Sequence, residues 1–174
     1  MIANLAAAWR WYESARRLAR TMERLGERHW DSLPWDGDLG RDNRLKELTA
    51  AEILNGSQMV LDDLDDLCVL MLFSVFEATI RERVLAEVDA EIPHLRHATI
   101  KHAVGDIREA VEEGSFFKVL EPYKHLDHDL IEQVNQVRRY RNWVAHGRRS
   151  KQPFAVNPAT AYERLNRFLE LIGA

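Results

Sequence analysis

The sequence predicts an all-α fold, an up-down helical bundle with a long N-terminal helix and a short C-terminal helix. Apolar residues recur at spacings of three and four along most of the 174 residues, which is the period of an amphipathic helix. Only five prolines and eight glycines occur, few for a chain built from short strands and turns. The length favours a single domain over residues 1–174, large enough to bury a core.

The N-terminal helix is expected over about residues 3–28, with arginines and glutamates on the face opposite its apolar positions. We expect the apolar face to pack in the core. A dimer contact is the alternative, because Trp9 and Trp11 point to different sides of the helix and one of them would be left exposed.

Residues 29–43 are rich in turn formers and are expected to form a loop. Trp30 and Trp35 either anchor this loop to the body of the protein or stack on a nucleic-acid base, and we favour anchoring. The next helix begins with a capping-box pair, Thr49 and Glu52, three residues apart.

Gly56-Ser57 either interrupts this second helix or marks a fresh start, after which a helix runs from about residue 58 to residue 91. Its middle, residues 67–76, is apolar on nearly all sides. Such a segment is expected to be buried by neighbours on several sides, at the centre of the bundle.

Two groups of candidate metal ligands are interpreted as surface residues, and no metal or other cofactor is expected. Four aspartates near a helix start have no histidine beside them and indicate a solvated acidic face: Asp62, Asp63, Asp65 and Asp66. Three histidines lack the i,i+4 spacing that places two ligands on one face: His94, His97 and His102. Cys68, the single cysteine, lies in an apolar run and is expected to be buried and unreactive.

Three helical elements complete the predicted bundle. A helix over about residues 100–111 closes at a glycine, and a short aromatic segment follows at residues 116–123. The next helix is capped by Asp127 or Asp129. The short C-terminal helix begins at Asn157-Pro158, a cap residue followed by a proline in the first helical position.

The charge pattern limits the classes of partner. The net charge is −4, so a nucleic-acid role must rest on a local basic patch. The longest apolar run, residues 67–76, is too short to cross a bilayer, and Arg10 and Glu13 arrive too early for a signal peptide. We expect a cytoplasmic protein with no membrane partner.

The most informative stretch is residues 137–149, expected to form the last turns of a helix that ends at Gly147. Arg141 falls in line with an apolar stripe, where a guanidinium is costly unless it is paired or faces a cleft. Asn142 and His146 are four residues apart and therefore share a side of the helix. Between residues 138 and 151 there are six lysines or arginines and no carboxylate.

The segment Arg141-Asn142-Trp143-Val144-Ala145-His146 resembles the signature of the HEPN superfamily: an arginine, a polar residue, a few more residues and a histidine late in a helix of an all-α bundle. The flanking arginines look most like the RiboL-PSP-type branch. The spacing by itself is weak, because Arg24 and His29 repeat it elsewhere in the chain. The context of Arg141 and His146, late in a helix and between basic residues, is what separates them from that pair.

The resemblance implies a metal-independent endoribonuclease that leaves 2′,3′-cyclic phosphate ends. Arg141 would bind the scissile phosphate, His146 would transfer protons, and Asn142 would hold the phosphate or orient His146. It also implies a homodimer in which two motif helices form one composite site, and in some members a toxin or defence role with an antitoxin partner. Five basic residues would follow the RNA backbone: Arg138, Arg139, Arg148, Arg149 and Lys151.

Glu77, flanked by apolar residues in the second helix, needs a cationic partner. It either orients Arg141 across a pair of helices or pairs with Arg81, four residues further on its own helix.

Two alternative functions stay open at the level of sequence. One is a catalytically silent HEPN module that binds a partner protein or a nucleotide. The other is a plain helical scaffold, for which Arg141 is expected to form a salt bridge in the core, far from any cleft.

Overall fold

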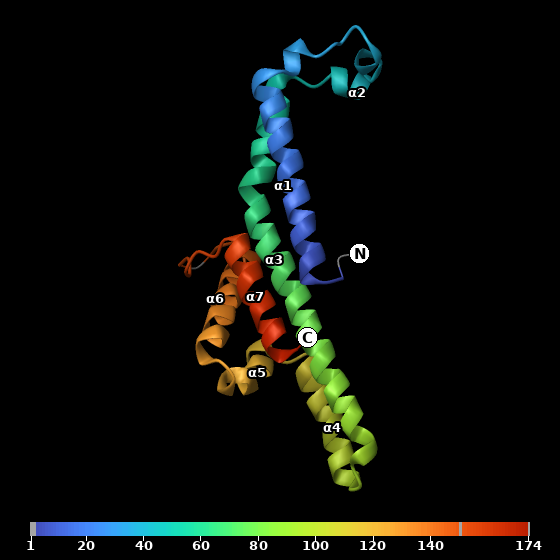
Figure 1. The fold of residues 1–174 in the computed structure, drawn as a ribbon, viewed down its shortest axis with the longest axis vertical. Coiled ribbons are helices and arrows are strands. Elements are labelled where there is room, and N and C mark those ends of the chain that lie inside the picture. The colour runs from blue at the N-terminus through green and yellow to red at the C-terminus, as the bar shows by residue number, and fades with distance from the viewer. Residues whose placement is uncertain (1–2, 150, 174) are drawn as a thin grey trace. The chain divides into compact units, whose positions relative to one another are not determined.

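The chain is all-α, as the sequence predicts. A computed structural model describes residues 3–149 and 151–173, and within them it contains seven α-helices, four short 3-10 turns and no strand (Figure 1). Along these residues no helix combines the length and the apolar character that a membrane span requires.

The chain divides into two compact units, Trp9–Cys68 and a second unit formed by Met1–Ala8 together with Val69–Ala174. The long helix α3 (Ala50–Glu91) contributes its first part to one unit and its second part to the other. The expectation of a single domain stays a prediction.

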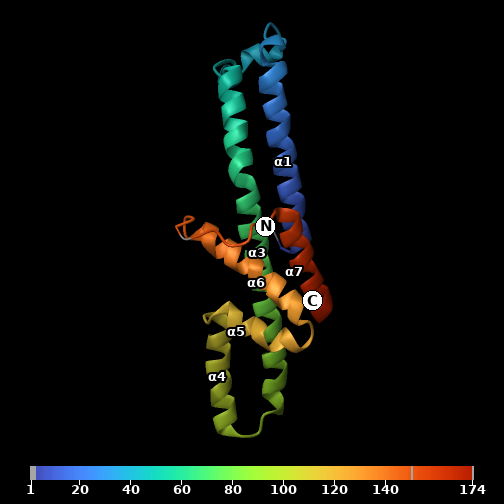
Figure 2. The same cartoon turned by 90° about the vertical axis from the view of Figure 1, so that its left-hand side faces the viewer.

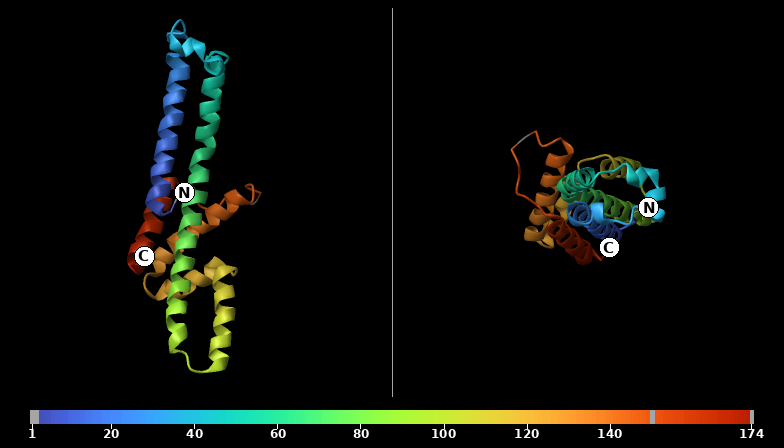
Figure 3. Two further views of the ribbon diagram at one scale, coloured as in Figure 1. Left: turned by 90° about the vertical axis from the view of Figure 1, so that its right-hand side faces the viewer. Right: turned by 90° about the horizontal axis from the view of Figure 1, so that it is seen from above.

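The unit Trp9–Cys68 is a helical hairpin in which α1 (Leu5–Arg28) and the first part of α3 run antiparallel (Figure 3, left). The Tyr12 hydroxyl donates a hydrogen bond of 2.7 Å to Asp65 Oδ1. Burial, and then this bond to a carboxylate, raise the pKa of Tyr12. The aspartate cluster is therefore not a purely solvated face, because Asp65 helps to join the two helices.

The two tryptophans of α1 differ, as their positions on the helix predict. Trp9 is half-buried, with its ring 5.3 Å from the ring of Tyr12, whereas 47% of Trp11 is exposed. The apolar face of α1 packs inward through Ala8, Tyr12 and Ala19.

The connection between α1 and α3 is more ordered than a plain loop. It contains the 3-10 turns Trp30–Ser32 and Asp38–Arg41 and the short helix α2 (Asn43–Lys46). The buried Trp30 donates its indole N–H to the carbonyl oxygen of Leu48 at 3.0 Å, and Trp35 donates to the carbonyl oxygen of Trp30 at 3.1 Å. Trp30 thus anchors this segment to the residues just before α3, and Trp35 packs against Trp30 within the segment.

Helix α3 begins with the predicted capping box. The Thr49 N–H donates to Glu52 Oε2 at 2.8 Å, and the Glu52 N–H donates to Thr49 Oγ1 at 3.2 Å. The helix then continues without a break for 42 residues, so the expected interruption or restart at Gly56-Ser57 is wrong. Ser57 is accommodated because its hydroxyl donates to the carbonyl oxygen of Ile53 within the same helix.

Aromatic rings form the core of the second unit. Phe73 and Phe76 of α3 lie 5.6 and 5.9 Å from Phe116, and Phe76 lies 5.5 Å from Phe168. These four rings come from α3, α5 (Phe116–Leu120) and α7 (Pro158–Ile172), so the cluster ties three elements together.

The apolar middle of α3 is less enclosed than its composition predicts. Cys68, Leu72 and Phe73 are buried, but 51% of Leu67 is exposed. Burial raises the pKa of the Cys68 thiol to about 12, in agreement with the expected inert side chain.

Helices α4 (Ala98–Glu112) and α6 (His128–Ala145) belong to the same unit, and α4 runs antiparallel to the second part of α3 (Figure 2). Of the two candidate caps for α6, Asp127 is the one used: its Oδ1 accepts from the Leu130 N–H at 2.9 Å. Asn157 caps α7 through a bond of 2.8 Å from the Thr160 N–H, as predicted.

The three histidines around the start of α4 are exposed, as expected. His97 has a structural role, because its Nδ1 accepts a hydrogen bond from the Thr99 N–H at 3.2 Å and caps the helix. In the described part of the chain, no three His, Cys, Asp or Glu side chains lie close enough together to hold a metal ion.

Candidate functional site

The candidate site is built on the end of α6, which closes in a Schellman motif. The helix ends at Ala145, two residues before the predicted end, and His146 is its C-cap residue. The Gly147 N–H donates to the carbonyl oxygen of Val144 and the Arg148 N–H to that of Trp143, both at 2.9 Å. Gly147 has a φ of +71°, which explains why glycine stands directly after the histidine.

Arg141 lies on the face of α6 that is turned toward α3. Its Nη1 donates to Asn142 Oδ1 at 3.0 Å, its Nη2 lies 3.8 Å from Glu77 Oε2, and its guanidinium lies 5.6 Å from the centre of the Phe73 ring. The side chain is 31% exposed. Arg141 is therefore paired, as its place in an apolar stripe predicts, and still reaches solvent.

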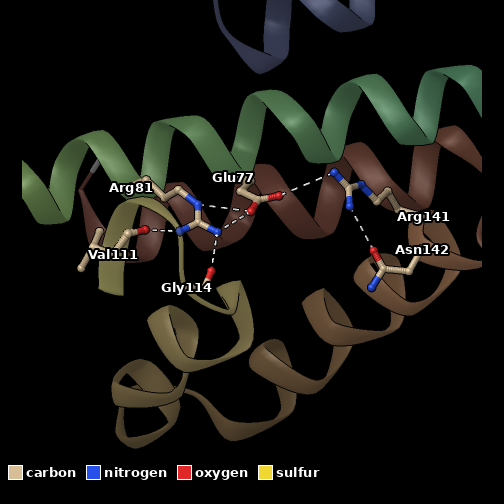
Figure 4. Close-up of polar contacts among 6 residues, drawn as sticks. All are labelled: Glu77, Arg81, Val111, Gly114, Arg141 and Asn142. Carbon is tan, nitrogen blue, oxygen red and sulfur yellow. Dashed lines mark hydrogen bonds and ion pairs between the residues drawn. The ribbon is translucent and has the colours of Figure 1, made fainter. Parts of the chain in front are cut away.

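Glu77 contacts both of the cations that the sequence offered as alternatives (Figure 4). Its Oε1 accepts from Arg81 Nη2 at 2.7 Å and from Arg81 Nε at 3.2 Å. Its other oxygen faces Arg141 at the longer distance of 3.8 Å. The bond to Arg81 is thus the primary one, and the contact with Arg141 is the weaker.

Arg81 is held from the other side by main-chain groups. It donates to the carbonyl oxygens of Val111 and Gly114, the latter at 3.1 Å, and its guanidinium lies 5.4 Å from the centre of the Phe116 ring. The side chains of Arg81 and Glu77 are 17% and 21% exposed. These contacts fix Glu77 in position, and Glu77 in turn faces Arg141.

The cluster of Arg81, Glu77 and Arg141 has two guanidinium groups and one carboxylate, so one positive charge is left uncompensated. Since Arg81 makes the closer contacts with Glu77, that excess lies mainly at Arg141. Arg141 Nε is buried and has no hydrogen-bond partner among the described residues, which costs about 1–3 kcal/mol for a typical buried donor.

His146 differs from Arg141 in having no contact of its own. Its side chain is exposed, makes no hydrogen bond or ion pair with the described residues, and lines an open depression with Ala145, Gly147 and Arg149. At roughly 100° per residue, Arg141 and His146 are about 140° apart around the helix axis. Asn142, the half-buried residue next to Arg141, is on the His146 side.

The five basic residues expected to follow RNA fall into two sets. Arg138 is half-buried, and its Nε donates a hydrogen bond to Asn135 Oδ1 at 3.1 Å. Its guanidinium lies 5.4 Å from the centre of the Phe117 ring. Burial, and then the nearby Arg139, lower the pKa of Arg138. The other four are exposed: Arg139, Arg148, Arg149 and Lys151. Arg138 therefore packs against neighbouring side chains and is less accessible to RNA than the other four.

Two of the exposed cations have partners within the chain. Arg139 pairs with Glu132, and Arg148 lies 5.8 Å from the centre of the Trp143 ring. Arg139 also lines a second open depression together with Lys151 and Phe154. Phe154 is 77% exposed, so this depression combines cations with an aromatic ring.

The comparisons with known proteins add no relative. No family model, no curated protein and no solved structure matches the chain. The resemblance to the HEPN superfamily therefore rests on the residues of α6 and stays a prediction.

Two parts of the site were missed by reasoning from sequence. The carbonyl groups of Val111 and Gly114 that hold Arg81 come from a segment 30 or more residues away, and no local pattern signals them. The Phe73 ring beneath Arg141 is likewise a tertiary contact. The i,i+4 spacing of Glu77 and Arg81 is the one local signal, and it indicates their pair as an alternative to the contact with Arg141.

Proposed function

We propose that the protein is a metal-independent endoribonuclease whose site lies at the C-terminal end of α6. The observation that carries the proposal is that a held guanidinium, Arg141, and an exposed and unengaged imidazole, His146, occur in one short stretch that contains no carboxylate. Asn142 lies between them and already contacts Arg141.

RNA supplies its own nucleophile, the 2′-hydroxyl, so the protein needs groups that move protons and stabilise charge. Histidine is suited to proton transfer near neutral pH. Arginine presents a planar cationic fork to phosphate oxygens. In this proposal the 2′-oxygen attacks the phosphorus and the 5′-oxygen leaves, giving a 2′,3′-cyclic phosphate and a 5′-hydroxyl. Arg141 stabilises the phosphate charge, and His146 takes or gives a proton.

One protomer has one such histidine, and the reaction needs two proton-transfer groups. The angle of about 140° between Arg141 and His146 also directs the two side chains away from each other on a single helix. We therefore include a homodimer in the proposal, with two α6 helices meeting near a two-fold axis so that each copy contributes to a shared cleft.

The proposed chemistry is tested by substrate structure. An RNA strand is compared with the same strand carrying one 2′-deoxy residue at the mapped cleavage position, with EDTA present, and the product ends are analysed. Loss of cleavage at that position, with cyclic phosphate ends elsewhere, supports the proposal. Cleavage of the 2′-deoxy strand contradicts it.

The second candidate, a silent module that binds a protein or nucleotide, is favoured by a specific contact. Glu77 and Asn142 already contact the two Nη atoms of Arg141. A phosphate must therefore compete with the Glu77 carboxylate for the guanidinium. The distance of 3.8 Å and the charge excess of the cluster make that competition weak, and for this reason we rank the nuclease first. A toxin or defence role with a neutralising partner belongs to the nuclease proposal and is tested by co-expression with the products of neighbouring genes.

A further inference from the structure

The second unit contains an apolar pocket that is not part of the candidate nuclease site. It lies between the second part of α3, α4, α5 and the turn after α5, and it has a volume of about 400 Å³. This volume falls within the usual range of small-molecule pockets. Its apolar walls are formed by Val84, Ile107, Ala110, Val111, Val119 and Pro122. None of the proposed catalytic residues lines it.

The polar groups that line this pocket are mainly unused donors. The side chains of Ser115, Lys118 and Tyr123 make no hydrogen bond or ion pair with the described residues. The single carboxylate of the lining, Glu87, is paired with Arg83 at 3.0 Å, which offsets its charge. The pocket therefore offers a cation and two hydroxyl groups to a ligand. Its one carboxylate, that of Glu87, already has a partner in Arg83.

The packing and the hydroxyl group of Tyr123 are consistent with a role as a hydrogen-bond donor in the pocket. Its ring packs edge-on against Phe168, with 5.6 Å between the ring centres. Burial, and then the nearby Glu87, raise the pKa of Tyr123, whereas Arg83 lowers it. A tyrosine hydroxyl is protonated at neutral pH even without such a shift, so it is able to donate. A rigid ring and a protonated hydroxyl are suited to orienting an acceptor at the edge of an apolar space.

We propose that this pocket binds a small amphipathic monocarboxylate, with the apolar tail between α3 and α4 and the carboxylate at Lys118, Ser115 and Tyr123. A charge-assisted hydrogen bond from Lys118 and neutral ones from the hydroxyl groups match the acceptor-only carboxylate. A cationic head has only Glu87 as a counterpart, and that carboxylate is already shared with Arg83.

The test is calorimetric titration of the full chain with octanoate and, as a matched probe, octylammonium, which has the same tail and the opposite charge. We expect octanoate to bind and octylammonium to bind at least about tenfold more weakly, the size of one charge-assisted hydrogen bond. Absence of octanoate binding at millimolar concentration, or equal binding of both probes, overturns the proposal.

Two variants locate the site. Lys118→Met keeps the aliphatic chain and should weaken octanoate binding about tenfold, whereas the control Lys101→Met, on an exposed position of α4 outside the pocket, should leave it unchanged. Ala110→Phe, at a solvent-exposed position of the pocket wall, should fill the pocket and abolish binding while circular dichroism shows a folded helix. Equal effects of Lys118→Met and Lys101→Met, or full binding by Ala110→Phe, contradict the site.

Discussion

The C-terminal part of α6 has two cationic regions that differ in how they are held. In the inner region, Arg141 lies between Phe73, Glu77 and Asn142, and Arg81 fixes Glu77 from the opposite side. In the outer region, His146 and Arg149 follow the end of the helix and are exposed. The two regions are only a few residues apart in sequence.

This difference has a chemical meaning. A group that stabilises charge on a phosphate is most effective when it is positioned in advance, because no reorganisation is then needed during the reaction. A group that transfers protons must reach the substrate and exchange protons with solvent. The held Arg141 and the exposed His146 fit these two roles, and the predictions below separate them.

Within the inner region, the largest effect is expected at Arg141. Arg141→Lys keeps the charge but loses the planar fork, so we expect RNA cleavage to fall by about 100-fold, equal to about 2.7 kcal/mol in activation free energy. Initial cleavage rates on one RNA strand measure this. The control Arg83→Lys alters an exposed pair on α3 and should cut like the parent. Equal rates for Arg141→Lys and the parent would remove Arg141 from the mechanism.

The inner region should also contribute to stability. Glu77→Gln leaves Arg81 and Arg141 without their carboxylate in a partly buried setting, and we expect the free energy of unfolding to fall by about 2 kcal/mol. Urea denaturation measures the change. Glu87→Gln is the matched control, because its pair with Arg83 is more exposed and should be worth less than about 0.5 kcal/mol. Similar losses for both variants would mean that the inner cluster has no special role.

A smaller effect is expected where the two regions join. Gly147→Ala places a Cβ at a φ of +71° and should lower the free energy of unfolding by about 1 kcal/mol. Gly56→Ala is the control of opposite sign, since it lies inside α3 with open space around it and should stabilise by about 0.5–1 kcal/mol. Thermal unfolding of both variants gives the comparison, and a stabilising Gly147→Ala would contradict the helix end described above.

The smallest effect is expected at the exposed cations that follow His146. Arg149→Gln and Lys151→Gln should each weaken RNA binding only a few-fold and reduce the slope of log affinity against log salt by about 0.7 for each lost phosphate contact on a single strand. Fluorescence anisotropy at several salt concentrations measures the slope. Lys101→Gln serves as the control, and an equal change in slope for it would indicate non-specific attraction alone.

Local signals in the sequence predicted much of the fold. The caps at Thr49, Asp127 and Asn157 depend on residues within three positions, so they could be found from the sequence, although Asp127 could not be separated from Asp129. The uninterrupted α3 at Gly56 could not be predicted, because helix packing can outweigh the local preference of a glycine.

The site was predictable to a lesser extent. The pattern around Arg141 showed that this cation needs a partner, and Glu77 is one of its partners. The anchoring of Arg81 on the carbonyl groups of Val111 and Gly114 required the fold, since no periodicity reports on a contact between distant segments. The end of α6 was misplaced by two residues because Gly147 follows the cap residue rather than ending the helix.

The most direct test of the account is cleavage of a mixed pool of single-stranded and structured RNA with EDTA present, comparing the parent with His146→Ala and with His102→Ala, an exposed histidine on α4. If His146 transfers protons in a metal-independent reaction, the parent and His102→Ala cut and leave cyclic phosphate ends, while His146→Ala does not. No cleavage by the folded parent, or equal cleavage by His146→Ala, would contradict it.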